Sequence, residues 1–363
     1  MSKKYYRLDN ILKLKARWMI IYGMRANGKS YAVKERVLKR AYENGKKFVY
    51  LRRWSEDIKV NAVKAYFADM PVDKITKGEY QGVTAYQGSI YFCTYDEKGQ
   101  PIRDGEPIGR YCSLNQAERY KSQAFPGVDT IIFEEFITDK IYLGSPSTGV
   151  TEPRILMQFV STVARDEDIE VFMIGNTISR TCPYFAEWGL LKGIMKQEPS
   201  SIDVYHLRGE NGVVDIAVEN CEVVETKSKM FFGLASKQIT SGEWDVNDVP
   251  KLLKPYDFYD MLYELRIVFA EFKYIMQLMY DGESGGTFVY IYPDTGVKRK
   301  IRRKITNIFN VDPFVTNGLR GDIKAEVLIA ECFRKGKVCF SDNLTGTDFR
   351  NVLNNYDLKG VIL

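Results

Sequence analysis

The sequence predicts an α/β fold, a mostly parallel sheet with helices on both faces, followed by a smaller α+β module. Short, continuous apolar runs that suit buried strands alternate with segments of helical periodicity, and this alternation is typical of parallel sheets. The first apolar run leads through a glycine-rich loop into a helix. An order of strands and helices that reads βββαβα near the end of the chain predicts the second module.

The first three elements are a strand at 18–22, a loop at 23–30 and a helix that continues until Gly45. The loop reads Gly-Met-Arg-Ala-Asn-Gly-Lys-Ser and fits the phosphate-binding pattern G-x-x-x-x-G-K-[ST] without mismatch. A loop between a strand and a helix points the unpaired N–H groups of the helix N-terminus at an anion. We therefore predict a nucleotide-binding site; the alternative is a glycine-rich turn that binds nothing.

Each part of the loop has a physical role in holding a nucleoside triphosphate. The glycines let backbone N–H groups curl around the β-phosphate, Lys29 neutralises the β and γ oxygens, and Ser30 is a ligand of Mg²⁺. Arg25 either touches phosphate or a neighbouring subunit, or only packs against the loop. We expect ATP and Mg²⁺ as cofactors, and the predicted nucleotide-binding residues are Gly23, Arg25, Asn27, Gly28, Lys29 and Ser30.

The elements that follow are, in order, a strand at 47–51, a helix at 58–70, short alternating strands at 89–94 and 109–114, a strand at 130–133, a helix at 151–165 and a strand at 171–174. The alternating runs predict an antiparallel excursion of the sheet. In parallel sheets, ligands bind beyond the carboxyl ends of the strands. We expect the phosphate loop, Glu134, Glu135 and Asn176 to converge at that edge.

Two adjacent carboxylates, Glu134 and Glu135, follow the strand at 130–133. Phosphoryl transfer to water needs a metal anchor and a group that orients the attacking water. We predict that Glu134 holds Mg²⁺ through water and that Glu135 polarises the attacking water; the alternative is that both only begin a solvated loop. The usual anchor is Asp, one methylene shorter, so the division of roles stays open. Asn176 either senses the γ-phosphate or caps a turn.

The rest of the chain predicts a connecting segment and the second module. Periodicity weakens from 209 to 258, where polar, glycine and proline residues increase. The module then has predicted strands at 272–280, 287–292 and 296–305, a helix at 322–335, a strand at 337–340 and a helix near 347–354. We expect domains at 1–208, 209–258 and 259–363.

A basic run, Lys-Arg-Lys-Ile-Arg-Arg-Lys, occupies residues 298–304 of this module. Such a run can neutralise the phosphates of DNA or RNA without reading sequence, or it can protect an exposed strand edge from aggregation. Both interpretations stay open. The candidate nucleic-acid contacts are Lys298, Arg299, Lys300, Arg302, Arg303 and Lys304.

Composition argues against several classes of protein. The six cysteines are widely spread and form no C-x-x-C pair, and the chain has a single histidine, so a structural zinc site or a redox motif is not expected. The net charge of +5 is modest. No run reaches membrane-spanning length and no signal-peptide core is present, so we expect a cytoplasmic protein without a membrane partner.

Five segments of the chain, at 23–30, 121–136, 162–165, 175–176 and 183–185, form an ordered set. This set resembles the DNA-packaging ATPases of the phi29-like phages, and the resemblance is weaker beyond the first two hundred residues. It implies a P-loop ASCE ATPase domain with a lid. It also implies an ATP-hydrolysing homo-oligomeric ring, a pentamer, that moves double-stranded DNA into a procapsid at the portal vertex in the host cytoplasm. The portal protein is then a partner, and a structural packaging RNA is a further candidate.

The resemblance also implies roles outside the phosphate loop. Arg165 resembles an arginine finger, and Lys121 resembles a basic residue that acts on the neighbouring subunit's nucleotide; the alternative for Arg165 is a surface arginine paired with Asp166 or Glu167. Residues 259–363 resemble a ribonuclease H-like nuclease module. Two-metal nucleases need several inward carboxylates, and the strand at 272–280 has only Lys273 as a charged residue. We expect a vestigial nuclease.

Three other functions remain open at this level. One is a packaging or repair nuclease with an active C-terminal module. Another is a nucleotide-dependent scaffold that binds RNA through the basic run at 298–304. A hexameric helicase is the third.

Overall fold

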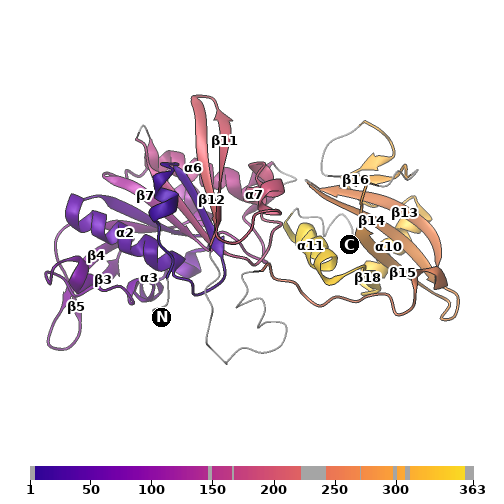
Figure 1. The fold of residues 1–363 in the computed structure, drawn as a ribbon, viewed down its shortest axis with the longest axis horizontal. Helices are drawn as coiled ribbons and strands as arrows, with labels where there is room; N and C mark the ends of the chain where they lie inside the picture. Colours follow the sequence, from indigo (N-terminus) through magenta and orange to yellow (C-terminus); the bar gives the residue numbers. More distant parts are fainter. Residues whose placement is uncertain are drawn as a thin grey trace. The chain divides into compact units, whose positions relative to one another are not determined.

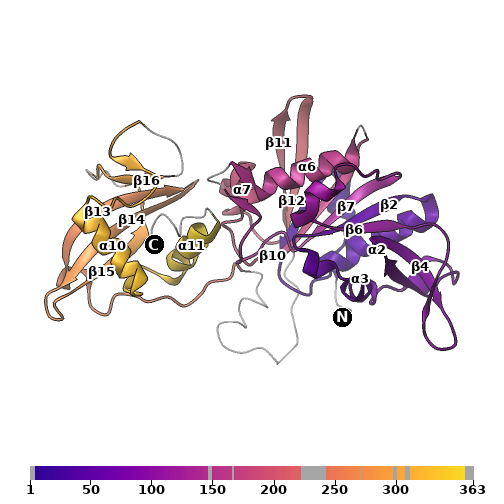
Figure 2. The same cartoon turned by 180° about the vertical axis from the view of Figure 1, so that it is seen from behind.

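The computed structural model describes residues 5–145, 149–165, 167–221, 243–269, 271–296, 301–306 and 311–355. The chain divides into two compact units (Figures 1 and 2). The first comprises Met1–Thr138, Val150–Ile178 and Gly193–Trp244, and the second comprises Asp139–Gly149, Ser179–Lys192 and Asp245–Leu363. Within the described ranges, no helix has the length and apolar character needed to cross a membrane.

The first unit contains a ten-stranded sheet in which β11-β12-β1-β10-β7-β2-β6-β4-β3 are neighbours and β5 pairs with β4. The strands are β1 (Trp18–Gly23), β2 (Lys47–Arg52), β3 (Gly82–Tyr86), β4 (Ser89–Tyr95), β5 (Pro101–Arg103), β6 (Gly109–Ser113), β7 (Val128–Glu134), β10 (Glu170–Asn176), β11 (Ser201–Gly209) and β12 (Gly212–Asn220). The six from β12 to β6 run parallel. The predicted mostly parallel α/β sheet and its antiparallel excursion through β3, β4 and β5 are confirmed.

Helices cover both faces of this sheet. They are α1 (Asp9–Lys13), α2 (Lys29–Asn44), η1 (Ser55–Ile58), α3 (Val60–Phe67), α4 (Val72–Ile75), η2 (Leu114–Gln116), α5 (Ala117–Tyr120), α6 (Glu152–Ala164) and α8 (Leu191–Ile194). Val33 and Val37 of α2 share one apolar core with Phe67 of α3 and with alternate strand residues such as Ile132. Helix α6 contacts β7 from the other face, as Figure 2 shows.

The hairpin of β11 and β12 extends the sheet beyond β1, with which β12 pairs in parallel. The sequence analysis assigned residues 209–258 to a linker, so the expected boundary after residue 208 falls at the turn of this hairpin. The periodicity is weak in β12 because Val213 and Val214 are exposed and the buried apolar run begins at residue 216. The domain limits themselves stay a prediction.

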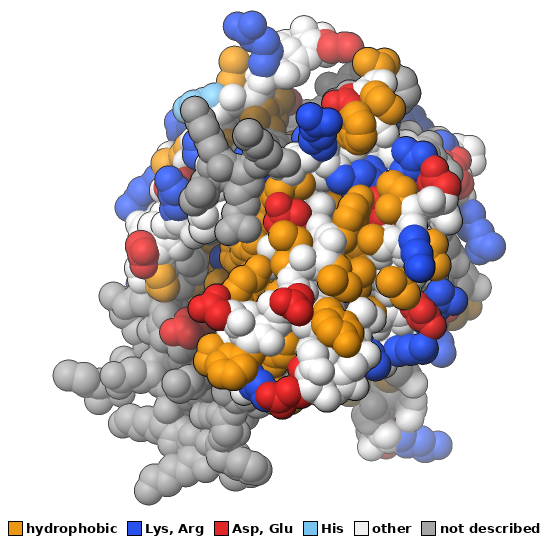
Figure 3. Space-filling model, turned by 90° about the vertical axis from the view of Figure 1, so that its right-hand side faces the viewer, with side chains coloured by type: hydrophobic (Ala, Val, Ile, Leu, Met, Phe, Trp, Pro, Cys, Tyr) orange, Lys and Arg blue, Asp and Glu red, His pale blue; other side chains and the backbone are white. Residues whose placement is uncertain are grey.

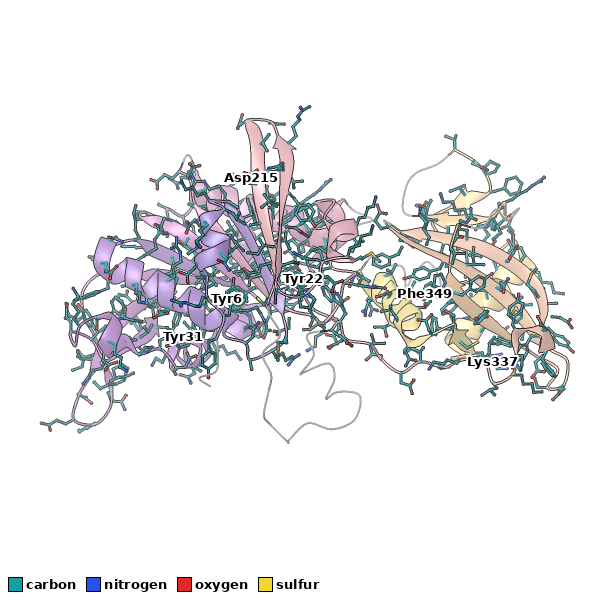
Figure 4. The ribbon with its side chains drawn as sticks, in the orientation of Figure 1. Tyr6, Tyr22, Tyr31, Asp215, Lys337 and Phe349 are labelled. Carbon is teal, nitrogen blue, oxygen red and sulfur yellow. The ribbon has the colours of Figure 1, made fainter. Side chains whose placement is uncertain are left out.

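The second unit is built on a six-stranded sheet in the order β17-β16-β13-β14-β15-β18. Its strands are β13 (Asp260–Phe269), β14 (Phe272–Asp281), β15 (Gly286–Pro293), β16 (Lys304–Thr306), β17 (Val315–Thr316) and β18 (Val338–Phe340), and its helices are α7 (Pro183–Glu187), η4 (Tyr256–Phe258), α10 (Lys324–Arg334) and α11 (Asn343–Asn355). The short strand β8 (Gly144–Ser145) also belongs to this unit, whereas β9 (Val150–Thr151) belongs to the first. Phe349 of α11 packs edge-on against Tyr274 of β14, with ring centroids 5.2 Å apart (Figure 4).

The predicted meander of this unit was wrong in one strand. The antiparallel strands are β13, β14 and β15. Of the predicted strand at 296–305, residues 297–300 lie outside the described residues, and its end belongs to β16, which pairs in parallel with β13. The sequence analysis missed β13, although the alternation of buried Leu265, Ile267 and Phe269 with more exposed neighbours is a strand signal. The helix, strand and helix that follow are confirmed as α10, β18 and α11.

The surface of the molecule mixes apolar and charged side chains, as the face in Figure 3 shows. In the second unit, exposed large apolar side chains include Leu253, Phe258 and Leu262. Isolated apolar residues are normal on protein surfaces.

Candidate active site

The phosphate loop connects β1 to α2 and opens onto a cavity of about 330 Å³. Gly23 and Gly28 have φ angles of 149° and 97°, which side chains rarely adopt, so the loop requires glycine at both positions. A Cβ on Gly23 would also lie 3.0 Å from Cβ of Cys221. The cavity is lined by Arg25, Ala26, Asn27, Gly28, Lys29, Ser30, Glu134, Glu135, Ile174, Gly175 and Asn176.

The N-terminal segment packs against this loop. The backbone N–H of Tyr6 donates to the carbonyl of Asn27 at 3.0 Å, and the Tyr6 hydroxyl donates to Oε2 of Glu219 at 2.6 Å. Figure 4 shows Tyr6 and Tyr22 in the first unit. Tyr22 of β1 stacks on Trp244, with centroids 5.3 Å apart. The loop is therefore braced from segments on both sides of it in the sequence.

The Lys29 ammonium is buried within the loop. Its Nζ lies 2.6 Å from the carbonyl oxygen of Met24 and 3.2 Å from Oδ1 of Asn27. It also lies 3.3 Å from Oδ1 of Asn176, which the sheet brings to the loop from the end of β10. Burial lowers the pKa of Lys29 to about 8. A phosphate in this cavity would supply the negative charge that the buried ammonium lacks.

Glu134 is buried at the end of β7, with 6% of its surface exposed. The Tyr66 hydroxyl donates to its Oε1 at 2.7 Å. Burial raises the pKa of this carboxyl, while hydrogen bonds from Tyr66 and Ser30 oppose that rise. The side chains of Ser30 and Glu134 thus lie close together in the wall of the cavity. Mg²⁺ prefers hard oxygen ligands, one or two from the protein and the rest from phosphate and water, and this pair fits that requirement.

Glu135 differs from its neighbour in both exposure and partner. Its carboxylate is exposed, and Oε2 forms an ion pair with Nη2 of Arg52 at 2.7 Å. Its backbone has a φ of 56°, an uncommon value for a residue with a side chain. Arg53 holds this turn by donating to the carbonyls of Glu135 and Phe136 at 3.1 and 2.7 Å.

Arg53 is itself paired with a buried glutamate. Its Nε lies 2.8 Å from Oε2 of Glu152, the first residue of α6, and the two residues expose 5% and 1% of their surfaces. Sequence reasoning missed the roles of Arg52, Arg53 and Tyr66. The sequence did contain a signal for the two arginines, because they directly follow the strand predicted at 47–51. That strand, β2, pairs in parallel with β7, so the residues after both strands meet at the same edge of the sheet.

Lys121 and Arg165 lie outside the cavity lining. Both side chains are exposed. Nζ of Lys121 pairs with Glu118 at 2.7 Å, and Nη2 of Arg165, at the C-terminal end of α6, donates to the carbonyl of Gln123 at 3.3 Å. The structure therefore does not bring these two residues to the phosphate loop of the same chain. The alternative partner Asp166 lies outside the described residues.

The basic run is only partly described. Lys298, Arg299 and Lys300 lie outside the described residues, and Arg302 is exposed. Lys304 is partly exposed in β16.

Arg303 is a correction to the predicted nucleic-acid contacts. Its exposed fraction is 5%, and its Nε pairs with Oε1 of Glu326 at 2.6 Å. It also donates to the carbonyls of Phe314 and Gly318. A guanidinium committed to these partners is a structural group of the second unit and is not offered to a nucleic acid. Charge alone could not separate this buried arginine from its exposed neighbours.

An active two-metal nuclease would need several carboxylates close together in the second unit. Among the residues described in the structure, no group of three or more His, Cys, Asp or Glu side chains is arranged to hold a metal ion. Asp342 instead accepts hydrogen bonds from the backbone and hydroxyl of Thr345 in the first turn of α11.

The strand, loop and helix at the carboxyl edge of a parallel sheet define the class of P-loop α/β folds. The family model of the podovirus DNA encapsidation protein (Gp16) matches residues 1–234. The chain belongs to this family, which confirms the resemblance to the phi29-like packaging proteins.

Two curated relatives are DNA packaging proteins of Bacillus phages. The protein of phage B103 is 32% identical over 178 residues, 49% of this chain and 49% of that protein. The protein of phage phi29 is 26% identical over 194 residues, 53% of this chain and 52% of that protein. The chain thus matches about half the length of these relatives.

A solved structure of the bacteriophage phi-29 viral genome packaging motor assembly resembles the chain with a TM-score of 0.56 and 20% sequence identity. The match covers 99% of both chains, so the fold is shared over both units.

Proposed function

We propose that this chain is an ATP-hydrolysing motor that moves double-stranded DNA into a preformed procapsid. The observation that carries the proposal is the convergence of the phosphate loop, with Ser30, and the two carboxylates Glu134 and Glu135 on one cavity. Membership of the encapsidation family and the names of the two phage relatives support DNA as the substrate that is moved.

The residues of the cavity would divide the work of hydrolysis. The loop N–H groups and Lys29 would hold the β- and γ-phosphates. Ser30 and Glu134 would hold Mg²⁺, which neutralises charge on the phosphate oxygens when it is bound. Glu135 would orient the attacking water and accept its proton, since its carboxylate lines the cavity and is exposed. Asn176, which contacts Lys29, would respond to the γ-phosphate.

Arg165 and Lys121 would complete the site of a neighbouring copy. Both are exposed cations outside the cavity of their own chain, and an arginine finger is a permanently charged group that reaches across an interface. This arrangement requires a head-to-tail interface between copies, and in a closed ring of such interfaces each copy both receives and supplies a cation. We propose a homopentamer at the portal vertex in the host cytoplasm, with the portal protein as its partner.

The remaining assignments follow from the family resemblance. Residues 1–208 form the P-loop ASCE ATPase domain with its lid, 209–258 the linker, and 259–363 a vestigial ribonuclease H-like module. A mixed sheet followed by helix, strand and helix supports the module. Arg302 and Lys304 are the described basic residues of the run that remain available for DNA or a packaging RNA.

Calorimetry with ATP and Mg²⁺ tests the proposal. The intact chain should bind, Lys29→Ala should lose most of the binding, and Lys39→Ala, which removes an exposed lysine of the same helix paired with Glu35, should bind like the parent. Duplex DNA or ring assembly should stimulate phosphate release. Absence of binding by the well-folded parent protein would overturn the proposal, and binding with background turnover in every assembly state would instead favour a nucleotide-dependent scaffold.

A further inference from the structure

Helix α3 brings a tyrosine hydroxyl to the carboxyl group that lies close to Ser30. Tyr66 donates to Oε1 of Glu134 at 2.7 Å, and it comes from a segment of the chain that no phosphate-binding motif includes. Tyr66 does not line the cavity, whereas Ser30 and Glu134 do. The hydroxyl can therefore affect a bound nucleotide only through Glu134.

The ring of Tyr66 is held by two neighbours. It stacks on Tyr50 of β2 with centroids 4.3 Å apart and an interplanar angle of 19°. Nζ of Lys34, on α2, lies 4.8 Å from the ring centroid. The position of the hydroxyl is thereby tied to the sheet on one side and to α2 on the other.

Lys34 also fixes the backbone that carries the ring. Its buried ammonium donates to the carbonyl of Tyr66 at 2.7 Å and pairs with Asp69. Because Lys34 is one turn after Ser30 on α2, the same helix that presents the Ser30 hydroxyl also anchors Tyr66. The two hydroxyl groups near the carboxyl of Glu134, those of Ser30 and Tyr66, are thus held by the same helix.

We propose that Tyr66 is a positioning residue that fixes the carboxylate of Glu134 for metal binding, an inference that rests on the proposed function. A glutamate has one more rotatable bond than an aspartate, so it loses more conformational freedom when its carboxylate must stay in one place. A hydrogen bond from the firmly held hydroxyl of Tyr66 restricts the carboxylate of Glu134 to one orientation before the metal binds. Outer groups that orient a metal ligand typically change metal affinity by about 10- to 100-fold when they are removed.

Tyr66→Phe is the direct test, because it deletes the hydroxyl and retains the ring that packs on Tyr50. The matched control is Tyr42→Phe, which deletes a tyrosine hydrogen bond to the exposed carboxylate of Glu79. Neither Tyr42 nor Glu79 lines the cavity. Binding of ATPγS is measured by calorimetry with and without Mg²⁺, and Mn²⁺ binding to the nucleotide complex is followed by paramagnetic resonance. Thermal unfolding reports whether each variant is folded.

The positioning role predicts a loss that is confined to the metal. Tyr66→Phe should bind metal-free ATPγS like the parent, bind Mn²⁺ about 10-fold more weakly or worse, and recover turnover when Mg²⁺ is raised. Tyr42→Phe should match the parent in all three measurements. A role in stability alone would lower the unfolding temperature and leave the Mn²⁺ affinity unchanged.

The outcomes separate this inference from the proposed function. Equal Mn²⁺ affinity in Tyr66→Phe and the parent, or an equal loss of metal-free and metal-dependent nucleotide binding, would overturn the positioning role while ATP binding by the parent stands. No nucleotide binding by the folded parent would overturn the proposed function, and the inference with it.

Discussion

At the residue scale, the two glutamates at the end of β7 have different environments and hence different chemistry. Glu134 is buried and accepts a hydrogen bond from Tyr66, an arrangement that suits a fixed metal ligand. Glu135 is exposed, and its carboxylate accepts a charged hydrogen bond from Arg52. A general base must be able to reach the attacking water, so the carboxylate of Glu135 has to break its ion pair with Arg52 before it can act.

The first prediction concerns this freer carboxylate. Glu135→Gln should lower ATP turnover by about 10²- to 10⁴-fold, the usual contribution of a general base, while the affinity for ATP and Mg²⁺ stays near that of the parent. Phosphate release and calorimetry measure the two quantities. The control is Glu210→Gln, which changes a glutamate at an exposed turn and should leave ATP turnover unchanged. Retention of turnover in Glu135→Gln would assign the base to another residue.

A second residue-scale prediction separates two adjacent arginines of the basic run. Arg303→Met should lower the free energy of unfolding by about 3–5 kcal/mol, because it leaves Glu326 buried without its cation. Arg302→Ala should leave the free energy of unfolding unchanged. It should make the slope of log K for DNA binding against log salt concentration shallower, by the amount that corresponds to the loss of about one phosphate contact. Chemical denaturation and binding at several salt concentrations test the pair. The reverse pattern would show that Arg303 faces the nucleic acid.

The same buried pair makes stability depend on pH. Burial alone would raise the pKa of Glu326, but hydrogen bonds from Arg303, Arg320 and Tyr263 give a net lowering. A carboxyl whose pKa is lower in the folded state stabilises the protein above its unfolded pKa, and that stabilisation is lost as the pH falls through the folded value. Acid should therefore destabilise the parent more than Arg303→Met.

At the scale of elements, α6 connects two regions of the proposed catalytic apparatus. Its first residue, Glu152, pairs with Arg53 beneath the Glu135 turn, and Arg165 follows its last turn. A helix is a stiff connection, so the position of the acidic turn and that of the exposed arginine are set by one element.

The third prediction tests that buried connection. Glu152→Gln should lower the free energy of unfolding by about 3–5 kcal/mol, since it leaves the Arg53 cation buried without a counter-charge, and should also lower turnover because Arg53 holds the backbone of Glu135. Denaturation and phosphate release are the measurements. Glu35→Gln, which breaks an exposed pair on α2, should change stability by about 0.5 kcal/mol or less. Equal effects of the two variants would argue against the connection.

At the scale of the whole molecule, neither Arg165 nor Lys121 lines the cavity of its own chain. Lys29 and Arg25 are the basic residues of the lining. This favours a site completed by a neighbouring copy.

The fourth prediction follows from that geometry. Arg165→Ala subunits and Glu135→Gln subunits should each be inactive alone, but mixtures should recover part of the activity, because some interfaces then pair an intact arginine with an intact glutamate. Turnover is measured across mixing ratios after ring assembly is verified. The control is Arg208→Ala, which changes an exposed residue of the hairpin. It should keep the turnover of the parent without being mixed with another variant. Mixed rings that assemble without any recovery would show that Arg165 acts within its own chain or not at all.

Much of the first unit could be predicted because its signals are local. The apolar run at 18–22, the loop at 23–30 and the carboxylates after 130–133 all lie where the sequence analysis expected them. In the second unit, β13 was missed although it forms a local hairpin with β14, and the parallel pairing of β16 with β13 was not predicted because it joins segments that are not neighbours in the sequence. A long-range partner cannot be inferred from a local pattern.

The sequence by itself determined the phosphate loop, the acidic pair and the family to which they point, because glycine conformations and short motifs depend on neighbouring residues. Only the tertiary structure decided which groups surround those motifs: Tyr66 on Glu134, Arg52 on Glu135, and Arg303 buried against Glu326. These contacts join elements far apart in the chain, and the burial that gives each its strength exists only when the sheet and its helices are packed together.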